Sequence, residues 1–225
     1  MTDPTAPHTP SAPTVHIAAY DTLADWECGH ALAHLRDGGY FRPSRPAYAV
    51  ATVGPAAGRP VTTMGGQRIT PDLALDALYP GDSALLILPG ARLWDTGTEL
   101  APFADKAREF LAAGVPVAAI CGATAGLARA GLLDDRAHTS GAAAYLGAQP
   151  GYRGAGHYRE ADAVRDGGLI TAGPTEPVAF AREIFAALDV MEPATLDAWD
   201  RLFARSDAAA FPVLQAAAAA RGGAA

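Results

Sequence analysis

Residues 115–130 constrain the fold more than any other part of the sequence, because an apolar run leads into a helix-forming run through Cys121 and Gly122. Residues 115–120 include no polar side chain, which is typical of a strand buried on both faces of a parallel sheet. The Ala- and Leu-rich residues that follow favour a helix. A strand that turns directly into a helix places the residue at the bend above the sheet edge, beside the first N–H groups of the helix. We therefore predict that Cys121 lies at a nucleophile elbow; an inert cysteine packed in the core is the alternative.

The other apolar runs indicate the fold class. Segments that we expect to form strands begin near residues 15, 47, 84, 116, 136 and 169; all but the one at 136 are mainly apolar, and helix-forming segments separate most of them. Alternating strands and helices predict an α/β fold with a doubly wound, mostly parallel sheet of the flavodoxin-like type. Among the connecting segments we expect helices over 23–36, 71–78, 99–113 and 176–188, a hairpin over 61–69 and a terminal hairpin over 163–173.

The sequence divides into three parts. Residues 1–13 include four prolines among Thr, Ala and Ser, so we expect a disordered leader. Residues 14–190 form the α/β domain, and residues 191–225 form an extension with a helix over about 194–204 and a frayed tail from Gln215. Four apolar side chains share one face of that helix: Leu196, Trp199, Leu202 and Phe203. This face must cover the domain, its pocket or another subunit, and we predict a homodimer.

Charge and cysteine content restrict the partners and the compartment. The net charge is −7 without any Lys/Arg run, which argues against nucleic acid or an anionic membrane as a partner. No apolar run approaches the roughly 20 residues of a membrane span. Cys28 and Cys121 are too few for a disulfide framework, and no signal peptide is evident, so we expect a cytoplasmic protein.

Three loops bring candidate site residues to one edge of the predicted sheet. Residues 25–27 follow the first strand, residues 89–91 follow the strand at 83–88, and Cys121 follows the strand at 115–120. Doubly wound sheets bind their ligands at the carboxyl ends of the strands. We therefore predict a single site formed by these loops.

Two histidines have the spacing of metal ligands. His30 and His34 are four residues apart on one helix face. No third ligand accompanies them, so we interpret both as core or solvated histidines. We expect neither a metal nor a cofactor.

The residues around Cys121 resemble the nucleophile region of a known family. The match lies in Ala-Ile-Cys-Gly-Ala-Thr-Ala-Gly-Leu-Ala over 119–128, in Ala-Gly-Leu-Leu-Asp over 130–134 and in Leu-Pro-Gly over 88–90. These residues are similar to those of the PfpI superfamily, which includes PfpI-type intracellular proteases, the Parkinson-disease deglycase, isonitrile hydratases and class I glutamine amidotransferases. The resemblance spans nearly all of residues 15–188 and implies the class I glutamine amidotransferase-like form of the fold.

The resemblance also implies roles for residues of the three loops. Glu27 matches a helix-borne carboxylate that shares a hydrogen bond with the nucleophilic cysteine and acts as an acid or base. The backbone N–H groups of Ala91 and Gly122 match the two oxyanion donors, with Ala91 standing where the family more often has glycine. We expect three residues to line the substrate pocket: Trp26, Gly90 and Trp94. For the last of these, a place in the core alone is the alternative.

A conventional cysteine–histidine dyad is not visible in the sequence. Many relatives have a histidine shortly after the Thr-Ser pair at 139–140, whereas this chain has Gly141. The residue that follows the cysteine is also a glycine. His138 and His157 are therefore the candidates to assist Cys121.

These features predict a cysteine-dependent enzyme that acts on a small electrophilic molecule as a hydrolase, a hydratase or a glyoxalase-like lyase. A glutaminase needs a histidine two residues before Glu176, and Pro174 stands there instead. Two alternatives stay open. One is a non-enzymatic redox or stress sensor whose Cys121 is oxidised beside Glu27. The other is a binding module that has lost catalysis.

Overall fold

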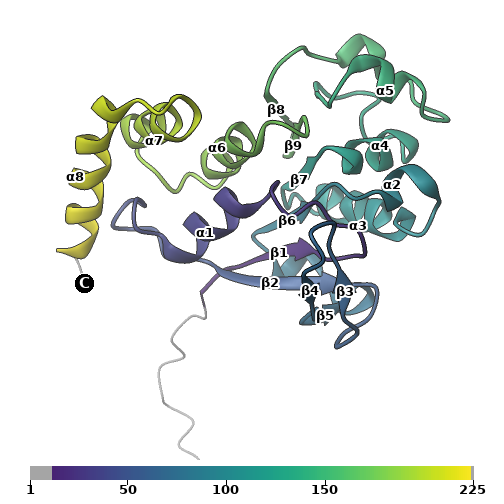
Figure 1. Cartoon of the computed structure of the whole chain (residues 1–225), viewed down its shortest axis with the longest axis horizontal. Coiled ribbons are helices and arrows are strands. Elements are labelled where there is room, and N and C mark those ends of the chain that lie inside the picture. Colours follow the sequence, from purple (N-terminus) through teal and green to yellow (C-terminus); the bar gives the residue numbers. More distant parts are fainter. Residues whose placement is uncertain (1–11, 224–225) are drawn as a thin grey trace, which may run out of the picture.

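A seven-stranded sheet passes through the centre of the molecule (Figure 1). The computed structural model describes residues 12–223. The strands of this sheet are β1 (Thr14–Ala18), β2 (Ala49–Gly54), β5 (Leu73–Ala74), β6 (Leu85–Leu88), β7 (Val117–Ile120), β8 (Ala163–Asp166) and β9 (Leu169–Ala172); β3 (Val61–Thr62) and β4 (Arg68–Ile69) form a separate antiparallel hairpin. The order is β5-β2-β1-β6-β7-β9-β8, and all neighbours are parallel except β8 and β9. The predicted doubly wound, mostly parallel fold is confirmed.

Helices cover both faces of the sheet. They are α1 (Gly29–Asp37), α2 (Leu93–Thr96), α3 (Ala101–Ala112), α4 (Gly122–Arg129), α5 (Ala143–Gly147), α6 (Pro177–Ala187), α7 (Pro193–Arg205) and α8 (Phe211–Gly222). Successive side chains of β6 point to opposite faces, so Leu85 and Ile87 join the core beneath α1 and α6, while Leu86 and Leu88 join the core beneath α3 and α4. All four are fully buried. Burial on both faces explains why the central strands carry so few polar residues.

The predicted hairpin over 61–69 is present as β3 and β4, and it holds the loop that carries Glu27. In that loop, the Asp25 carboxylate accepts hydrogen bonds from Thr63 Oγ1 at 2.5 Å and from Gly65 N at 2.6 Å. These bonds hold the loop in a series of turns. As a result, α1 begins at Gly29 and not at residue 23 as predicted. The prediction that Glu27 lies on a helix is therefore wrong.

The predicted helix over 71–78 is also wrong. The edge strand β5 and a single 3₁₀ turn (Leu75–Ala77) take its place. The Asp72 carboxylate accepts hydrogen bonds from the backbone N–H and the hydroxyl of Thr52 on β2, at 2.8 and 2.7 Å. These bonds tie the segment to the sheet edge in an extended form.

The predicted strand at 136–140 does not join the sheet. It forms one isolated bridge, to Tyr158, within the described residues. The backbone N–H of Thr139 donates to the hydroxyl of Thr171 on β9 at 2.9 Å. Because this bond goes to a side chain and not to a backbone carbonyl, the segment does not pair with β9 as a strand.

The C-terminal extension packs on the chain's own domain, with α7 beside α6 (Figure 1). The rings of Trp199 and Phe203 on α7 lie 5.4 and 5.1 Å from the ring of His34, and His30 lies 5.5 Å from Phe203. Both histidines thus belong to an aromatic cluster. Among residues 12–223, no three His, Cys, Asp or Glu side chains gather as metal ligands. Since the chain covers the apolar face of α7 itself, that face does not support the homodimer, which stays a prediction.

The tail that was expected to fray forms α8. Its Ala-rich sequence has high helix propensity, and its Leu214 is fully buried. At the end of the helix, Arg221 Nη1 donates to the carbonyls of Arg42 and Arg45 at 3.1 and 2.8 Å. These contacts fix the extension against the loop that precedes β2.

The predicted leader at 1–13 lies outside the described residues apart from Ala12 and Pro13. The Pro13 carbonyl accepts the Ala49 backbone N–H at 3.0 Å, so the described chain begins at the sheet. Nowhere in the described part is a helix both long enough and apolar enough to cross a membrane.

Candidate active site

Cys121 lies at the bend between β7 and α4. Its backbone N–H donates to the Ala172 carbonyl on β9 at 3.0 Å, and its carbonyl accepts the Thr124 N–H at 3.1 Å. The φ of 58° and ψ of −128° at Cys121 lie outside the regions that L-residues favour. The side chain is partly exposed and not sealed in the core. The backbone thus has the strained strand-to-helix turn of a nucleophile elbow.

Glu27 meets Cys121 over Gly90. The Glu27 side chain is fully buried, and its Oε2 accepts the Gly90 backbone N–H at 2.5 Å. A Cβ built on Gly90 would lie 2.7 Å from Glu27 Oε1 and 2.8 Å from Cys121 Cβ, so only glycine fits between them. Among the described residues, no group forms a hydrogen bond with Oε1. The Cys121 thiol is close enough to this carboxyl for each group to shift the pKa of the other.

Burial sets the protonation of this pair. Burial raises the pKa of Glu27 to about 7, against the lowering effect of the hydrogen bonds from Gly90 and Cys121. Burial, followed by the negative charge of Glu27, raises the pKa of the Cys121 thiol to about 12. Between these values the two side chains hold one proton. The carboxylate is then the base nearest to the thiol.

Ala91 and Gly122, whose backbone N–H groups are the predicted oxyanion donors, both line the cavity beside the sulfur. The Gly122 N–H points to the sulfur and lowers the pKa of the thiol. Ala91 adopts no positive φ, so alanine is accommodated at this position without strain. The oxyanion role of the two N–H groups stays a prediction.

A cavity of about 320 Å³ opens beside the sulfur. It is lined by Met64, Ala91, Arg92, Asp95, Cys121, Gly122, Gly141, Tyr145 and Pro174. Most of these residues are apolar or have no side chain beyond Cβ. The size suits a small molecule better than an extended peptide.

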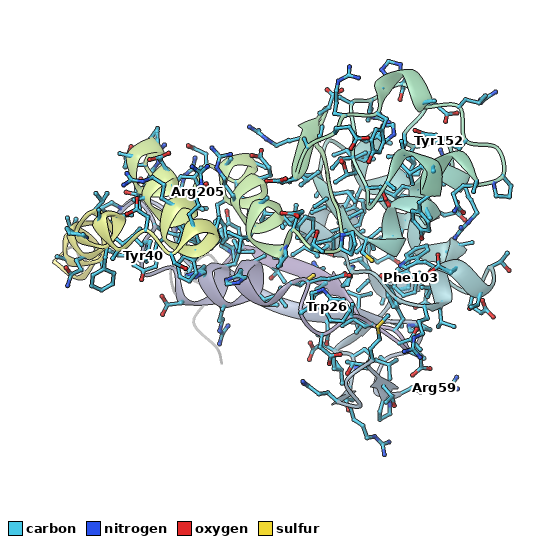
Figure 2. The ribbon with its side chains drawn as sticks, turned by 45° about the horizontal axis from the view of Figure 1, so that its top comes forward. Trp26, Tyr40, Arg59, Phe103, Tyr152 and Arg205 are labelled. Atoms are coloured by element: carbon cyan, nitrogen blue, oxygen red, sulfur yellow. The ribbon has the colours of Figure 1, made fainter. Side chains whose placement is uncertain are left out.

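Of the three predicted pocket residues, Trp26 is not among the residues that line this cavity, and it bonds to one of them. Its side chain is 53% exposed, and its Nε1 donates to the carbonyl of Pro174, which lines the cavity, at 3.0 Å. Figure 2 shows Trp26 near the middle of the molecule. Gly90 lies behind the cavity, between Glu27 and Cys121, and acts through its N–H.

Trp94 does not line the cavity and belongs to the core. It is buried, and its Nε1 donates to Tyr20 Oη at 3.0 Å and to the Pro89 carbonyl at 3.1 Å. The Tyr20 hydroxyl also donates to the Pro89 carbonyl. The two side chains therefore fix the peptide that leads into Gly90 and Ala91.

Neither predicted histidine reaches the cavity. His138 is fully buried, its Nδ1 pairs with the Arg136 carbonyl at 2.7 Å, and its Nε2 pairs with Tyr152 Oη at 2.8 Å. Figure 2 shows Tyr152 well away from Trp26. His157 is exposed on the 3₁₀ turn Ala155–His157 and does not line the cavity.

Gly141, where many relatives have a histidine, packs against the cavity-lining Pro174. A Cβ built on Gly141 would lie 3.1 Å from Pro174 Cδ. A histidine at 141 would therefore need this proline to move.

Several cavity residues had not been identified from the sequence. Met64 comes from the β3–β4 hairpin, Arg92 and Asp95 come from the start of α2, and Tyr145 comes from α5. Arg92 and Asp95 directly follow the 89–91 loop, so their position in the sequence could have indicated that they lie near the site. Nothing in the local sequence indicates this for Met64 and Tyr145, because long-range packing brings them to the sulfur.

Comparison with known proteins shows the family to which the chain belongs. The model of the DJ-1/PfpI family matches residues 13–187. The Bacillus subtilis (strain 168) "Uncharacterized protease YoaZ" is 39% identical over 189 residues, which cover 84% of this chain and 89% of YoaZ. A thiJ/pfpI family protein from Bacillus anthracis has a similar crystal structure, with a TM-score of 0.86 and 36% identity, over 92% of this chain and 98% of that one. The DJ-1 superfamily protein Atu0886 from Agrobacterium tumefaciens has a TM-score of 0.76 and 37% identity, over 86% and 98% of the two chains. The chain belongs to the DJ-1/PfpI family.

Proposed function

We propose that the protein is a cysteine-dependent enzyme that acts on a small electrophilic molecule. The Cys121 sulfur attacks the electrophilic carbon, and the thiol proton passes to the Glu27 carboxylate. The electron pair of the attacked double bond moves to oxygen, where the N–H groups of Ala91 and Gly122 bind the negative charge.

The same groups, Glu27 and Cys121, also carry out the release of the product. When the substrate is an amide, the tetrahedral intermediate collapses to a thioester, and the Glu27 proton leaves with the amine. Water then attacks the thioester carbon and gives a proton to Glu27. Expulsion of the sulfur, which takes that proton back, yields the acid and restores the enzyme. A 2-oxoaldehyde follows the same first step, and the oxygen then takes the proton from Glu27 to give a thiohemiacetal. An isonitrile has no oxygen: the sulfur adds to its terminal carbon, and the thiol proton passes through Glu27 to that carbon, which gives a thioimidate.

The contact between the Glu27 carboxyl and Cys121 over Gly90 carries this proposal. It puts a base whose pKa is raised to about 7 next to the sulfur, so proton transfer needs no histidine. The cavity of about 320 Å³ beside the sulfur has room for a small molecule, which supports a small substrate even though the Bacillus subtilis relative is named a protease.

The test compares wild type with Cys121→Ala and Glu27→Gln on a panel of simple amides, isonitriles and methylglyoxal. We expect turnover of one class by wild type, none by Cys121→Ala, and a loss of about 100-fold or more in Glu27→Gln, typical of the removal of a general acid–base. Turnover that survives in Cys121→Ala overturns the proposal.

The redox sensor is a second candidate, favoured by the unpaired Glu27 Oε1 beside the sulfur. Two equivalents of a peroxide would each transfer one oxygen to sulfur and be reduced, giving a sulfinate. The protonated Glu27 carboxyl would donate a hydrogen bond to a sulfinate oxygen. Mass spectrometry after mild peroxide treatment separates the candidates: oxidation confined to Cys121, without turnover of the panel, favours the sensor. Absence of both favours a binding module.

A further inference from the structure

Asp95 and Tyr145 form a polar pair in the wall of the Cys121 cavity. They come from α2 and α5, and Tyr145 Oη donates to Asp95 Oδ1 at 2.6 Å. No Lys or Arg forms an ion pair with Asp95 within residues 12–223, although Arg92 lines the same cavity. The proposed chemistry at Cys121 does not use this pair.

The pair offers hydrogen-bond acceptors to the cavity. A tyrosine hydroxyl has one proton, and Tyr145 gives it to Asp95 Oδ1. Asp95 Oδ2 accepts no hydrogen bond from the described residues, and a carboxylate has no proton to donate. Because Asp95 is exposed, solvent can bind this oxygen, and an occupant that displaces the solvent has to bring an N–H or O–H of its own.

The sulfur side of the cavity has the opposite character. There the N–H groups of Ala91 and Gly122 are the proposed donors, and Met64, Gly141 and Pro174 supply apolar walls. A well-matched occupant thus has an acceptor oxygen near the sulfur and a donor group directed at Asp95. Primary carboxamides are the simplest molecules with both.

We propose that the Asp95–Tyr145 pair selects substrates that carry an N–H or O–H donor next to the electrophilic carbon, such as small primary carboxamides, over electrophiles that lack one. This inference rests on the proposed function and names the substrate class of the same site. Asp95 is the recognition residue, and Tyr145 is a positioning residue that holds its carboxylate.

The test uses alkylating probes that differ only in the donor group. Wild type is treated with 2-iodoacetamide or with 2-iodo-N,N-dimethylacetamide, and each rate is divided by the rate of the same probe with glutathione. In each reaction the sulfur forms a bond to the CH₂ carbon, iodide leaves with the C–I electron pair, and Glu27 takes the thiol proton. Mass spectrometry assigns the adduct to Cys121, because Cys28 is buried.

We expect wild type to prefer iodoacetamide by about tenfold, as for a hydrogen bond to a charged acceptor. Asp95→Ala should bring the normalised ratio close to one without slowing the dimethyl probe, which shows that the site is still folded. Tyr145→Phe should give an intermediate ratio. The matched control Asp135→Ala, whose carboxylate is 78% exposed outside the cavity, should keep the wild-type ratio.

Three outcomes contradict the inference. Equal normalised rates in wild type exclude donor recognition, and an unchanged preference in Asp95→Ala excludes this residue. If no probe alkylates Cys121, the proposed function itself fails, and the inference fails with it.

Discussion

The indole ring of Trp94 lies directly on Gly126 of α4, and a Cβ built on Gly126 would be 2.1 Å from Cζ3 of Trp94. The same ring donates its N–H to the Pro89 carbonyl, one residue before Gly90. Packing between α2 and α4 therefore fixes two of the three loops that meet at the sulfur.

Gly126→Ala should lower the free energy of unfolding by about 2 kcal/mol, because the added methyl group has to displace a buried indole ring. Urea titration monitored by tryptophan fluorescence measures this. In the control Gly147→Ala, on α5, the new Cβ meets no atom within 4 Å. That substitution should be neutral or stabilise the protein by about 0.5 kcal/mol. Equal losses in both variants would contradict the packing argument.

Cys121→Gly should be more stable than Cys121→Ala by about 1 kcal/mol. At a φ of 58° and ψ of −128°, alanine keeps the strain that glycine avoids. At an ordinary helix or strand position the order is reversed, since glycine loses more entropy on folding. Chemical denaturation of the two variants shows directly which of them has the larger free energy of unfolding. A less stable glycine variant would mean that the elbow is not strained.

Gly90→Ala should separate Glu27 from Cys121 and slow alkylation of Cys121 by about tenfold or more, since small displacements of paired groups cost large factors in rate. The rate of iodoacetamide labelling measures this, with thermal melting to verify folding. Gly29→Ala, at the start of α1, is the control, because its new Cβ contacts nothing within 4 Å. Wild-type labelling of a folded Gly90→Ala protein would rule out the proposed coupling.

Arg221→Ala should destabilise the protein by about 1 to 2 kcal/mol. The guanidinium donates to the carbonyls of Arg42 and Arg45 and lies 5.8 Å from the centre of the Phe41 ring, and these contacts are lost together. Arg205→Ala is the comparison, because that side chain is 73% exposed and has one ion pair at 4.0 Å. Its effect should stay below about 0.5 kcal/mol. Similar effects of the two variants would show that α8 contributes little to stability.

The buried strands could be predicted from the local sequence, but the structure of several connecting segments could not. The apolar run before Cys121 has no polar alternation, and such a run has few places in a protein other than the middle of a parallel sheet. By contrast, Asp25 and Asp72 override the helix signals around them by bonding to residues on other elements, Thr63 and Thr52. Side-chain bonds of this kind leave no periodic pattern in the sequence.

The candidate site, too, could be predicted only in part from the sequence. Glu27 was found through the resemblance to a family, although the helix on which it was placed begins two residues later. The family pattern could not reveal that both His138 nitrogens are occupied, or that Tyr145 reaches Asp95 from α5. Both are long-range contacts between segments that carry no motif.

The pH dependence of Cys121 alkylation tests the central claim, that Glu27 accepts the thiol proton, most directly. Below about pH 7 both groups are protonated and the rate should be low, and it should rise as Glu27 loses its proton, with a midpoint near 7. In Glu27→Gln only the buried thiol titrates, so the midpoint should move above 9.0, the ordinary value for the thiol. A midpoint near 7 that is unchanged in Glu27→Gln would contradict the account.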